Sequence, residues 1–531
     1  MMLQKIPFRS THAFTEFFQK YIEQHPSLKS YYNHFPSLEN FGKQIKEKAG
    51  SFPKANRKVL VDVLQRQYQP LKPIGAVETN IQSLLEENTF TVTTGHQLSI
   101  FTGPLYFIYK IVTVIRTCQE LKKKYPKSHF VPVYWMASED HDYEEIKSFR
   151  LYGKKYTWET VQQGAVGRFQ TKDIKQLFDQ LPGEVGIFRE AYLKSGSLSE
   201  AVRKYVHALF ASEGLIVMEA DDKDFKTLFQ KVMSDDLFEH TPFKLVTETN
   251  KELETLDLHP QVNPREINFF YLEKDLRSRL EQHGKAFPVV DTDLKFSKEE
   301  ITKKIKESPE VFSPNVILRP LYQEMILPNL AYVGGPAELV YWLELKKVFD
   351  HHQTPFPILL PRNFALVVDA PTSRKISKTR LHLEAFFEEK DDLYKRWLSQ
   401  HSTHNLSLDE TSRQLDQLLA EVQARCANID ATLSPMAAAQ AAKMKKMIQT
   451  IELKMVRAEK RLQSDSLRQI EAVKDALFPN GSLQERTDNF LNFYQQDASF
   501  IEKLLEHFDP FDFQFNVLSY HDQKGTSEIL S

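Results

Sequence analysis

Two short polar clusters contain residue types that could do chemistry. In Thr94-Gly-His-Gln97, an imidazole and an amide follow a β-prone run and could donate hydrogen bonds to phosphate oxygens. In Ser138-Glu-Asp-His-Asp142, three carboxylates surround an imidazole, where they could raise one another's pKa or hold a hard cation. The ordinary alternatives are a loop histidine bonded to a neighbouring segment and a solvated charged turn.

A strand–helix–strand unit is expected to position both clusters. Residues 89–94 are β-prone, residues 104–121 carry an apolar helical pattern, and residues 130–136 have the pattern of a buried strand. Strands connected in this way run parallel, and such sheets bind ligands at the carboxyl ends of their strands. Because each cluster directly follows one of these strands, we predict that the two clusters lie together in an active site.

A third cluster combines Arg319 with the turn Gly334-Gly-Pro-Ala-Glu338. The chain has only 17 glycines, so a pair of them marks a place where the backbone could approach a ligand closely. Arg277, Arg279 and Arg362 could supply planar forks for anions, although surface arginines are the ordinary alternative.

The segment Lys375-Ile-Ser-Lys378 is a short match to the lysine loop with which nucleotidyl-transfer enzymes of the class I type hold phosphates. The chain contains neither a GxGxxG nor a GxxxxGK[ST] pattern. A nucleotide would therefore have to bind by a device other than a glycine-rich cradle.

The patterns along the rest of the chain predict an α/β core followed by helices. Further strand-like runs cover residues 214–219, 314–320, 357–362 and 365–369, whereas residues 1–80 have helical patterns. Ser407-Leu-Asp-Glu410 has the pattern of a capping box, and Ser434-Pro435 that of a helix start.

No proline or glycine occurs between Met436 and Leu477, and a helix of that length would be about 60 Å long. Two apolar stripes joined by a short turn predict an antiparallel coiled-coil hairpin with an architectural or dimerising role. We therefore expect a core over residues 1–380 with inserted segments at about 150–310, the hairpin over 381–490, and a segment over 491–531 that returns toward the core.

Composition excludes several classes of protein. The chain has 69 basic and 71 acidic side chains and a formal net charge of -2, which argues against a nucleic-acid or polyanion binder. Two cysteines cannot form a disulfide scaffold or a thiolate metal knuckle, and both Cys118 and Cys426 fall in apolar helical patterns typical of packing. No run approaches the roughly 20 apolar residues of a membrane span, and the first residues lack the pattern of a signal peptide, so we expect a cytoplasmic protein.

Five separated motifs, in this order, resemble those of the BshC family, the cysteine-adding enzymes of bacillithiol biosynthesis. The resemblance runs from near residue 90 to near residue 490 and covers most of the chain. The motifs are Thr94-Gly-His-Gln-Leu-Ser-Ile-Phe-Thr-Gly-Pro104, Trp135-Met-Ala-Ser-Glu-Asp-His-Asp142, Ser313-Pro-Asn-Val-Ile-Leu-Arg-Pro320, Gly334-Gly-Pro-Ala-Glu338 and Phe478-Pro-Asn-Gly-Ser-Leu-Gln-Glu-Arg486.

The resemblance implies a Rossmann-like core with inserted connecting segments, a protruding coiled coil and a homodimer. It also implies the last step of bacillithiol biosynthesis, in which L-cysteine is joined by an amide bond to the free amine of glucosaminyl-malate. ATP or another adenine nucleotide is the expected co-substrate, and the resemblance leaves any metal open. The chain differs from class I activating enzymes because it lacks a full HIGH-type signature and has only a vestigial lysine loop.

These implications assign a role to each cluster. We expect His96 and Gln97 to stabilise charge on a phosphate or acyl oxygen, and Asp140 or Asp142 to bind the cysteine ammonium or deprotonate the sugar amine, with His141 orienting them or relaying a proton. Arg319 and Arg277 or Arg279 are candidates for the malate carboxylates. The remaining candidates are Thr94, Gly95, Trp135, Ser138, Glu139, Gly334, Gly335 and Glu338 for substrates, and Lys375 and Lys378 for the nucleotide.

Two other functions fit the same residues. One is a metal-assisted hydrolase that uses the cluster from Glu139 to Asp142. The other is a non-catalytic scaffold in which the coiled coil is the functional part and the core is a degenerate nucleotide-binding domain.

Overall fold

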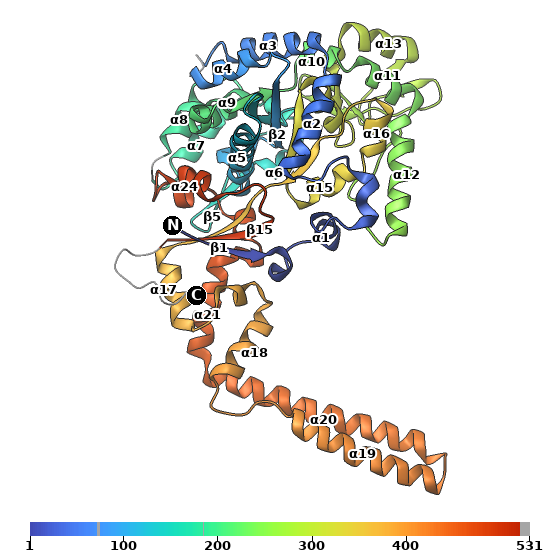
Figure 1. The fold of residues 1–531 in the computed structure, drawn as a ribbon, viewed down its shortest axis with the longest axis vertical. Coiled ribbons are helices and arrows are strands. Elements are labelled where there is room, and N and C mark those ends of the chain that lie inside the picture. The colour runs from blue at the N-terminus through green and yellow to red at the C-terminus, as the bar shows by residue number, and fades with distance from the viewer. Residues whose placement is uncertain (72–74, 184, 521–531) are drawn as a thin grey trace.

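The computed structural model describes residues 1–71, 75–183 and 185–520. At its centre is a sheet of five parallel strands in the order β13-β12-β2-β3-β6. Helices surround this sheet, and a helical hairpin extends away from it (Figure 1). The strands are β2 (Thr89–His96), β3 (His129–Met136), β6 (Ile216–Glu219), β12 (Asn329–Gly334) and β13 (Ile358–Pro361).

The strand order reverses between β2 and β12. From β2 the chain passes through α5 (Tyr106–Lys124) to β3 and through α9 (Leu198–Phe210) to β6, and it then returns to place β12 on the other side of β2. From β12 it passes through α15 (Pro336–Leu343) and α16 (Lys346–His351) to β13. This is the doubly wound Rossmann order, in which ligands bind at the reversal point. The predicted fold class, a Rossmann-like parallel sheet with a coiled coil, is confirmed.

Long segments are inserted into the crossovers of this sheet. Between β3 and β6 lie α6 (Tyr143–Ile146), the hairpin of β4 (Ser148–Leu151) and β5 (Lys154–Thr157), α7 (Lys175–Phe178) and α8 (Gly186–Leu193). Between β6 and β12 lie α10 (Lys223–Thr227), α11 (Gln230–Glu239), α12 (Thr241–Thr255), β7 (Phe269–Glu273), β8 (Leu276–Arg279), β9 (Ala286–Pro288), β10 (Lys295–Ser297), α13 (Lys298–Glu307), β11 (Phe312–Pro314) and α14 (Arg319–Ile326).

The strand predicted over residues 314–320 is wrong. The strand found in this region, β11, ends at Pro314, and α14 begins at Arg319. Pro320 lies in the first turn of α14, where the N–H that proline lacks would have no partner within the helix. The residues in between form the loop that enters this helix, in which Ile317 and Leu318 are buried and Val316 is exposed.

A second sheet joins the two ends of the chain to the core. In it, β15 (Gln514–Ser519) pairs antiparallel with β1 (Met2–Pro7) and parallel with β14 (Phe364–Val368). The helical prediction for residues 1–80 is therefore wrong for β1, although α1 (Glu16–Ile22), α2 (Leu38–Ser51), α3 (Lys54–Tyr68) and α4 (Gly75–Ser83) follow it. Residues 521–531 of the predicted C-terminal segment lie outside the described residues.

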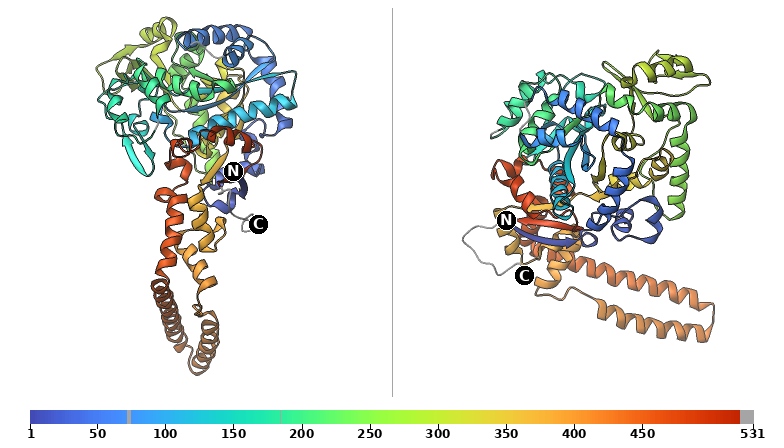
Figure 2. Two further views of the ribbon diagram at one scale, coloured as in Figure 1. Left: turned by 90° about the vertical axis from the view of Figure 1, so that its left-hand side faces the viewer. Right: turned by 45° about the horizontal axis from the view of Figure 1, so that its top comes forward.

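The predicted coiled-coil hairpin is present. Helices α19 (Asp409–Ile429) and α20 (Leu433–Leu462) run side by side and protrude from the core (Figures 1 and 2). Its base is formed by α17 (Ala370–Thr379), α18 (Lys390–His401) and α21 (Ser464–Leu477), after which α22 (Gln484–Thr487), α23 (Leu491–Tyr494) and α24 (Phe500–His507) return to the core. No helix among the described residues is long and apolar enough to cross a membrane.

Three details of the hairpin differ from the prediction. The Ser407 hydroxyl accepts the N–H of Asp409 two residues on, so it forms a local turn, and α19 begins without a side-chain cap. The second helix begins at Leu433 rather than after Ser434. The predicted long helix is also divided, because the backbone at Gln463 separates α20 from α21.

A buried ion pair ties the returning segment to the core. Arg362 Nη2 donates to Glu485 Oε1 over 2.5 Å, and the two side chains are 2% and 0% exposed. Removing one partner of such a pair leaves an uncompensated buried charge. The pair therefore holds α22 against the end of β13.

We expect Glu485→Ala to lower the free energy of unfolding by about 3–5 kcal/mol, measured by urea denaturation at pH 7. The matched control is Glu471→Ala, which removes an exposed partner of Lys390 and should change the free energy by less than about 1 kcal/mol. Equal effects of the two substitutions would contradict the role of the buried pair.

Candidate active site at the carboxyl edge of the parallel sheet

The two predicted polar clusters meet at the carboxyl ends of β2 and β3. These strands pair with His96 opposite Met136, so the residues that follow them start side by side. Gln97 Nε2 donates to Asp140 Oδ2 over 2.9 Å and to Glu145 Oε2 over 2.7 Å. The side chains of the first cluster therefore bond directly to those of the second.

One ammonium group connects the elements at the reversal point. Lys110 Nζ, from α5, donates to the Gly95 carbonyl over 2.8 Å and lies 2.6 Å from Glu338 Oε1 on α15. The Tyr332 hydroxyl donates to Glu338 Oε2 over 2.6 Å. Burial alone would raise the pKa of Glu338, but Lys110 and Tyr332 hold it below its usual range. Glu338 is therefore a carboxylate at neutral pH.

The guanidinium of Arg319 lies beside this pair, and its Nη1 donates to Gln323 Oε1 over 3.2 Å. Its guanidinium is 5.8 Å from the ring centre of Trp135, 5.5 Å from that of Tyr332 and 5.9 Å from that of Trp342. Its Nη2 is buried and has no hydrogen-bond partner among the described residues. A planar cation held by rings, with an unused N–H, is suited to bind a carboxylate or a phosphate.

Gly95 is the residue that allows Arg319 to come close to β2. A Cβ atom at position 95 would lie 3.3 Å from Arg319 Nη1 and 3.4 Å from the Tyr332 hydroxyl. At Gly334 a Cβ would lie 3.0 Å from Leu339 Cδ2, while the N–H of Gly335 donates to Glu338 Oε1 over 3.3 Å. The glycine pair thus serves the turn between β12 and α15.

His96 is held as a neutral imidazole. Its ring packs against Tyr106 and Phe107, with centres 5.4 Å and 5.1 Å away. Burial lowers the pKa of His96 well below its usual value, and the charges of Lys110 and Arg362 lower it further. Its Nε2 is buried and has no partner among the described residues, so this atom is available to a ligand.

The acidic cluster is matched by cations from the inserted segments. Glu139 forms a buried ion pair with Lys226 of α10, and burial raises the pKa of Glu139 although Lys226 opposes this. Arg277 of β8 donates from Nη1 to His141 Nδ1 over 2.5 Å and lies 3.5 Å from Asp140 Oδ1. Burial and Arg277 lower the pKa of His141, so His141 is neutral and its Nδ1 is already engaged.

These pairs weigh against a divalent cation at the cluster. Two of its three carboxylates already have cationic partners, while Asp142 is exposed. Ser138 donates its hydroxyl to Glu219 at the end of β6. The cluster is therefore arranged to form ion pairs and hydrogen bonds across three strand ends.

Several predicted residues lie away from this edge or have structural roles. Thr94 is buried and donates to the Val333 carbonyl over 2.8 Å, which joins β2 to β12. Arg279 is exposed on β8. Lys375 and Lys378 are exposed on α17, which packs beside α21. The loop expected there is wrong, because Asp369 caps a helix that begins with a proline in its first turn and contains both lysines.

Neither cysteine is placed for chemistry. Cys118 lies on α5, and burial raises the pKa of its thiol far above the usual value, so the reactive thiolate is disfavoured. Cys426 lies on α19 of the protruding hairpin.

Sequence reasoning named Arg277 but missed the two lysines that pair with Glu338 and Glu139. Lys110 had a signal, since it is the one charge within the apolar run from Leu105 to Ile115. Lys226 had none, because it pairs with a residue 87 positions away. Nothing in the sequence marked Tyr332 as the hydrogen-bond donor to Glu338.

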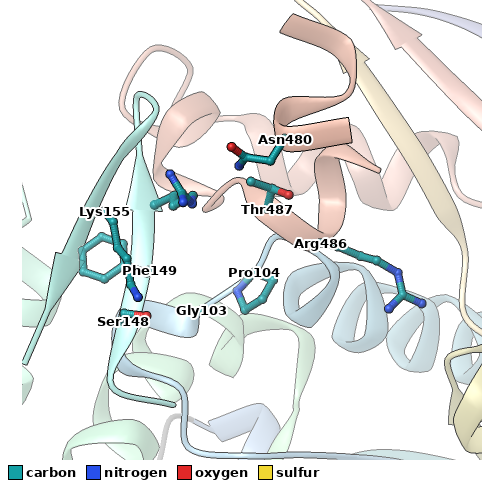
Figure 3. Close-up of a pocket in the computed structure, with 9 residues that line it drawn as sticks. Gly103, Pro104, Ser148, Phe149, Lys155, Asn480, Arg486 and Thr487 are labelled. Carbon is teal, nitrogen blue, oxygen red and sulfur yellow. The ribbon is translucent and has the colours of Figure 1, made fainter. Parts of the chain in front are cut away.

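A cavity of about 280 Å³ lies between the loop after β2 and the returning segment. Gly103 and Pro104 border it together with residues of the β4–β5 hairpin, and Arg486 points away from Phe149 and Lys155 (Figure 3). None of the residues predicted to be catalytic borders it, so we place the candidate site at the sheet edge and not in this cavity.

Two family models and several known proteins match this chain. A family model described as "Bacillithiol biosynthesis BshC, N-terminal Rossmann-like domain" matches residues 1–363, and one described as "Bacillithiol biosynthesis BshC, C-terminal coiled-coil domain" matches residues 365–520. A protein of Flavobacterium johnsoniae named "Putative cysteine ligase BshC" is 40% identical over 525 residues, which are 97% of this chain and 99% of that protein. A protein of the same name from Cytophaga hutchinsonii is 39% identical over 518 residues, which are 98% of this chain and 99% of that protein.

Glu338→Gln should destabilise the protein at pH 7 by about 1–3 kcal/mol, because Lys110 then lacks a charged partner. The pKa of Glu338 is lowered in the folded protein, so its stabilising effect is present above the unfolded value of about 4.3 and is lost as pH falls through the folded pKa. The difference between wild type and variant should therefore shrink as pH falls below about 4.3. Urea denaturation between pH 7 and pH 3.5, with exposed Glu78→Gln as control, measures this, and a pH-independent difference would contradict it.

Proposed function

Because this chain belongs to the BshC family of bacillithiol biosynthesis, we propose that it joins the carboxyl group of L-cysteine to the free amine of glucosaminyl-malate. The observation that carries the proposal is the pairing of two kinds of group at one edge of the sheet. Arg319 Nη2 and His96 Nε2 are buried and unpartnered, and the carboxylates of Asp140 and Asp142 lie at the adjoining strand end. Such an edge can hold an anionic substrate beside a cationic or amine substrate.

An amide bond cannot form from a free carboxylate without activation. One cysteine carboxylate oxygen attacks a phosphorus of ATP, giving an acyl phosphate and ADP or an acyl adenylate and pyrophosphate. The sugar amine then attacks the carbonyl carbon, loses a proton, and expels phosphate or AMP. Oxygen charge that develops in both steps requires hydrogen-bond donors placed before the reaction.

The unpartnered donors fit the anionic parts of these molecules. Arg319 Nη2 and Arg362 Nε are buried N–H groups without a partner among the described residues, and either can bind a carboxylate or phosphate oxygen. His96 Nε2 supplies a neutral hydrogen-bonding atom in the same region. Lys375 and Lys378 do not fit this role, because α17 belongs to the base of the hairpin.

The acidic side of the site fits the amines. Gln97 fixes Asp140 through a hydrogen bond of 2.9 Å, and Asp142 is exposed beside it. We assign one of these carboxylates to the cysteine ammonium and the other to the proton of the attacking amine. Arg277 engages His141 Nδ1, so His141 orients the cluster and does not accept a proton at that atom.

The purified protein should convert L-cysteine, glucosaminyl-malate and ATP into a new thiol, detected by mass spectrometry. We expect His96→Ala and Asp140→Asn each to lower the rate about 100-fold or more, with unchanged circular dichroism. Lys375→Ala is the matched control and should keep the wild-type rate.

Three outcomes would contradict this proposal. Wild-type protein that forms no thiol would favour the scaffold alternative. Full activity in both site variants would place the chemistry elsewhere. Loss of activity in Lys375→Ala alone would move the phosphate site to α17.

We also propose that the chain forms a homodimer through the hairpin. Apolar side chains remain exposed on α19 and α20, including Leu418 at 57% and Ile451 at 48%. Large exposed apolar surfaces are usually covered by a partner. On both helices, exposed apolar side chains occur along the length of the helix. The full set is Leu418, Val422, Ile429, Met436, Met444, Met447, Ile451, Leu453 and Leu462.

Light scattering should give the mass of a dimer for wild type and of a monomer for the double variant Leu418→Glu, Ile451→Glu. The control Leu85→Glu changes an exposed leucine of the core and should leave the dimer intact. Wild-type protein that remains monomeric would overturn this proposal.

A further inference from the structure

A group of metal-ligating side chains lies apart from the candidate active site. Asp235 is on α11, His351 is the last residue of α16, and His352 caps that helix. Asp235 Oδ2 is 3.4 Å from Nε2 of His351 and 3.4 Å from Nε2 of His352. The three ligand atoms lie within 4.8 Å of one another, and among the described residues no other group of three such side chains has this arrangement.

Two atoms of the group are buried without a hydrogen-bond partner among the described residues. They are Asp235 Oδ2 and His352 Nε2, and the His352 side chain is only 6% exposed. Thr241 donates its hydroxyl to Asp235 Oδ1 over 2.8 Å, which orients the carboxylate and leaves Oδ2 directed at the histidines. A simple histidine–aspartate hydrogen bond would satisfy both atoms, but it is not formed.

The two distances from Asp235 Oδ2 to the histidine nitrogens match those between ligands of a tetrahedral zinc site. Zinc–ligand bonds of about 2.0–2.1 Å at tetrahedral angles separate neighbouring ligand atoms by about 3.3–3.4 Å. Two imidazole nitrogens favour Zn²⁺ over Mg²⁺ or Ca²⁺, which prefer oxygen ligands. The bond from Thr241 to Asp235 is the kind of outer contact that orients a metal ligand.

We propose that Asp235, His351 and His352 bind one Zn²⁺ ion, with water as the fourth ligand. His351 is 44% exposed on its side chain, so the fourth position faces solvent. The ion joins α11, in the insertion between β6 and β12, to α16 of the Rossmann core. Its role is to fix the insertion to the core.

The position of the site separates it from the chemistry at the sheet edge. Helices α15 and α16 carry the chain from the carboxyl end of β12 back to the start of β13. His351 and His352 come at the end of that path, six to seven residues before β13 begins at Ile358, and therefore toward the amino edge of the sheet. Zinc binding here does not depend on the proposed ligase activity.

Zinc titration of the full-length, chelator-treated protein by calorimetry tests the proposal. We expect one saturable site in wild type and a rise in Tm on adding Zn²⁺, because the ion binds only the folded chain. His351→Gln, at a partly exposed position that packing does not depend on, and Asp235→Asn should each weaken Zn²⁺ binding by more than about tenfold and reduce the rise in Tm. The control His283→Gln removes an exposed histidine beside Glu281 and should bind as wild type does.

Cobalt provides a readout of geometry. Co²⁺ added to the wild-type protein should give the visible absorption of a tetrahedral site, and this absorption should be absent in His351→Gln. No saturable Zn²⁺ binding, or equal affinity in wild type and His351→Gln, would overturn the proposal. Because none of these measurements uses the ligase substrates, failure here is distinguishable from failure of the proposed function.

Discussion

The contact between the buried ammonium of Lys110 and the partly exposed carboxylate of Glu338 is the interaction on which the candidate site depends. Lys110 reaches both the Gly95 carbonyl and Glu338, so one ammonium group links the end of β2, helix α5 and helix α15. These are the elements that meet where the strand order reverses. Removing two charges from water is costly, and a buried ion pair is weak evidence for added stability. We infer that the main effect of this ion pair is to position the site, because it fixes the turn after β12 relative to the turn after β2.

The other groups at this edge lie on the strands and helices around this ion pair, which together form the frame of the site. Gly95 leaves space for Arg319, and the rings of Trp135, Tyr332 and Trp342 hold the guanidinium in place. A guanidinium is weakly hydrated and stacks well on aromatic faces, so it tolerates this burial better than an ammonium would. The same burial, with nearby positive charge, keeps His96 neutral. The edge therefore offers donors to anions on the β2–β12 side and carboxylates to amines on the β3 side.

The sequence predicted the β2–α5–β3 part of this frame through local patterns. Periodicity located β2, α5 and β3, and the rule that parallel strands bind ligands at their carboxyl ends brought Gln97 next to Asp140. It could not find Lys226, because an ion pair between residues far apart in the sequence leaves no local pattern. Nor could it find β1, a short strand whose partner is at the other end of the chain. Lys375 and Lys378 show the opposite error, because a four-residue resemblance suggested a loop where Asp369 caps a helix that contains both lysines.

Buried polar atoms without a hydrogen-bond partner lie near both edges of the parallel sheet. The atoms at the two edges favour ligands of opposite charge. At the carboxyl edge the unused groups of Arg319 and Arg362 are N–H donors, which select anions. Between α11 and α16 the unused atom of Asp235 is an oxygen with a free lone pair, and it faces the nitrogens of two imidazoles, which together select a cation. Leaving a buried polar atom unpaired costs about 1–3 kcal/mol, and a ligand that bonds to the atom would offset that cost. The same physical argument therefore supports both proposals, an anionic substrate at one end of the sheet and a metal ion at the other.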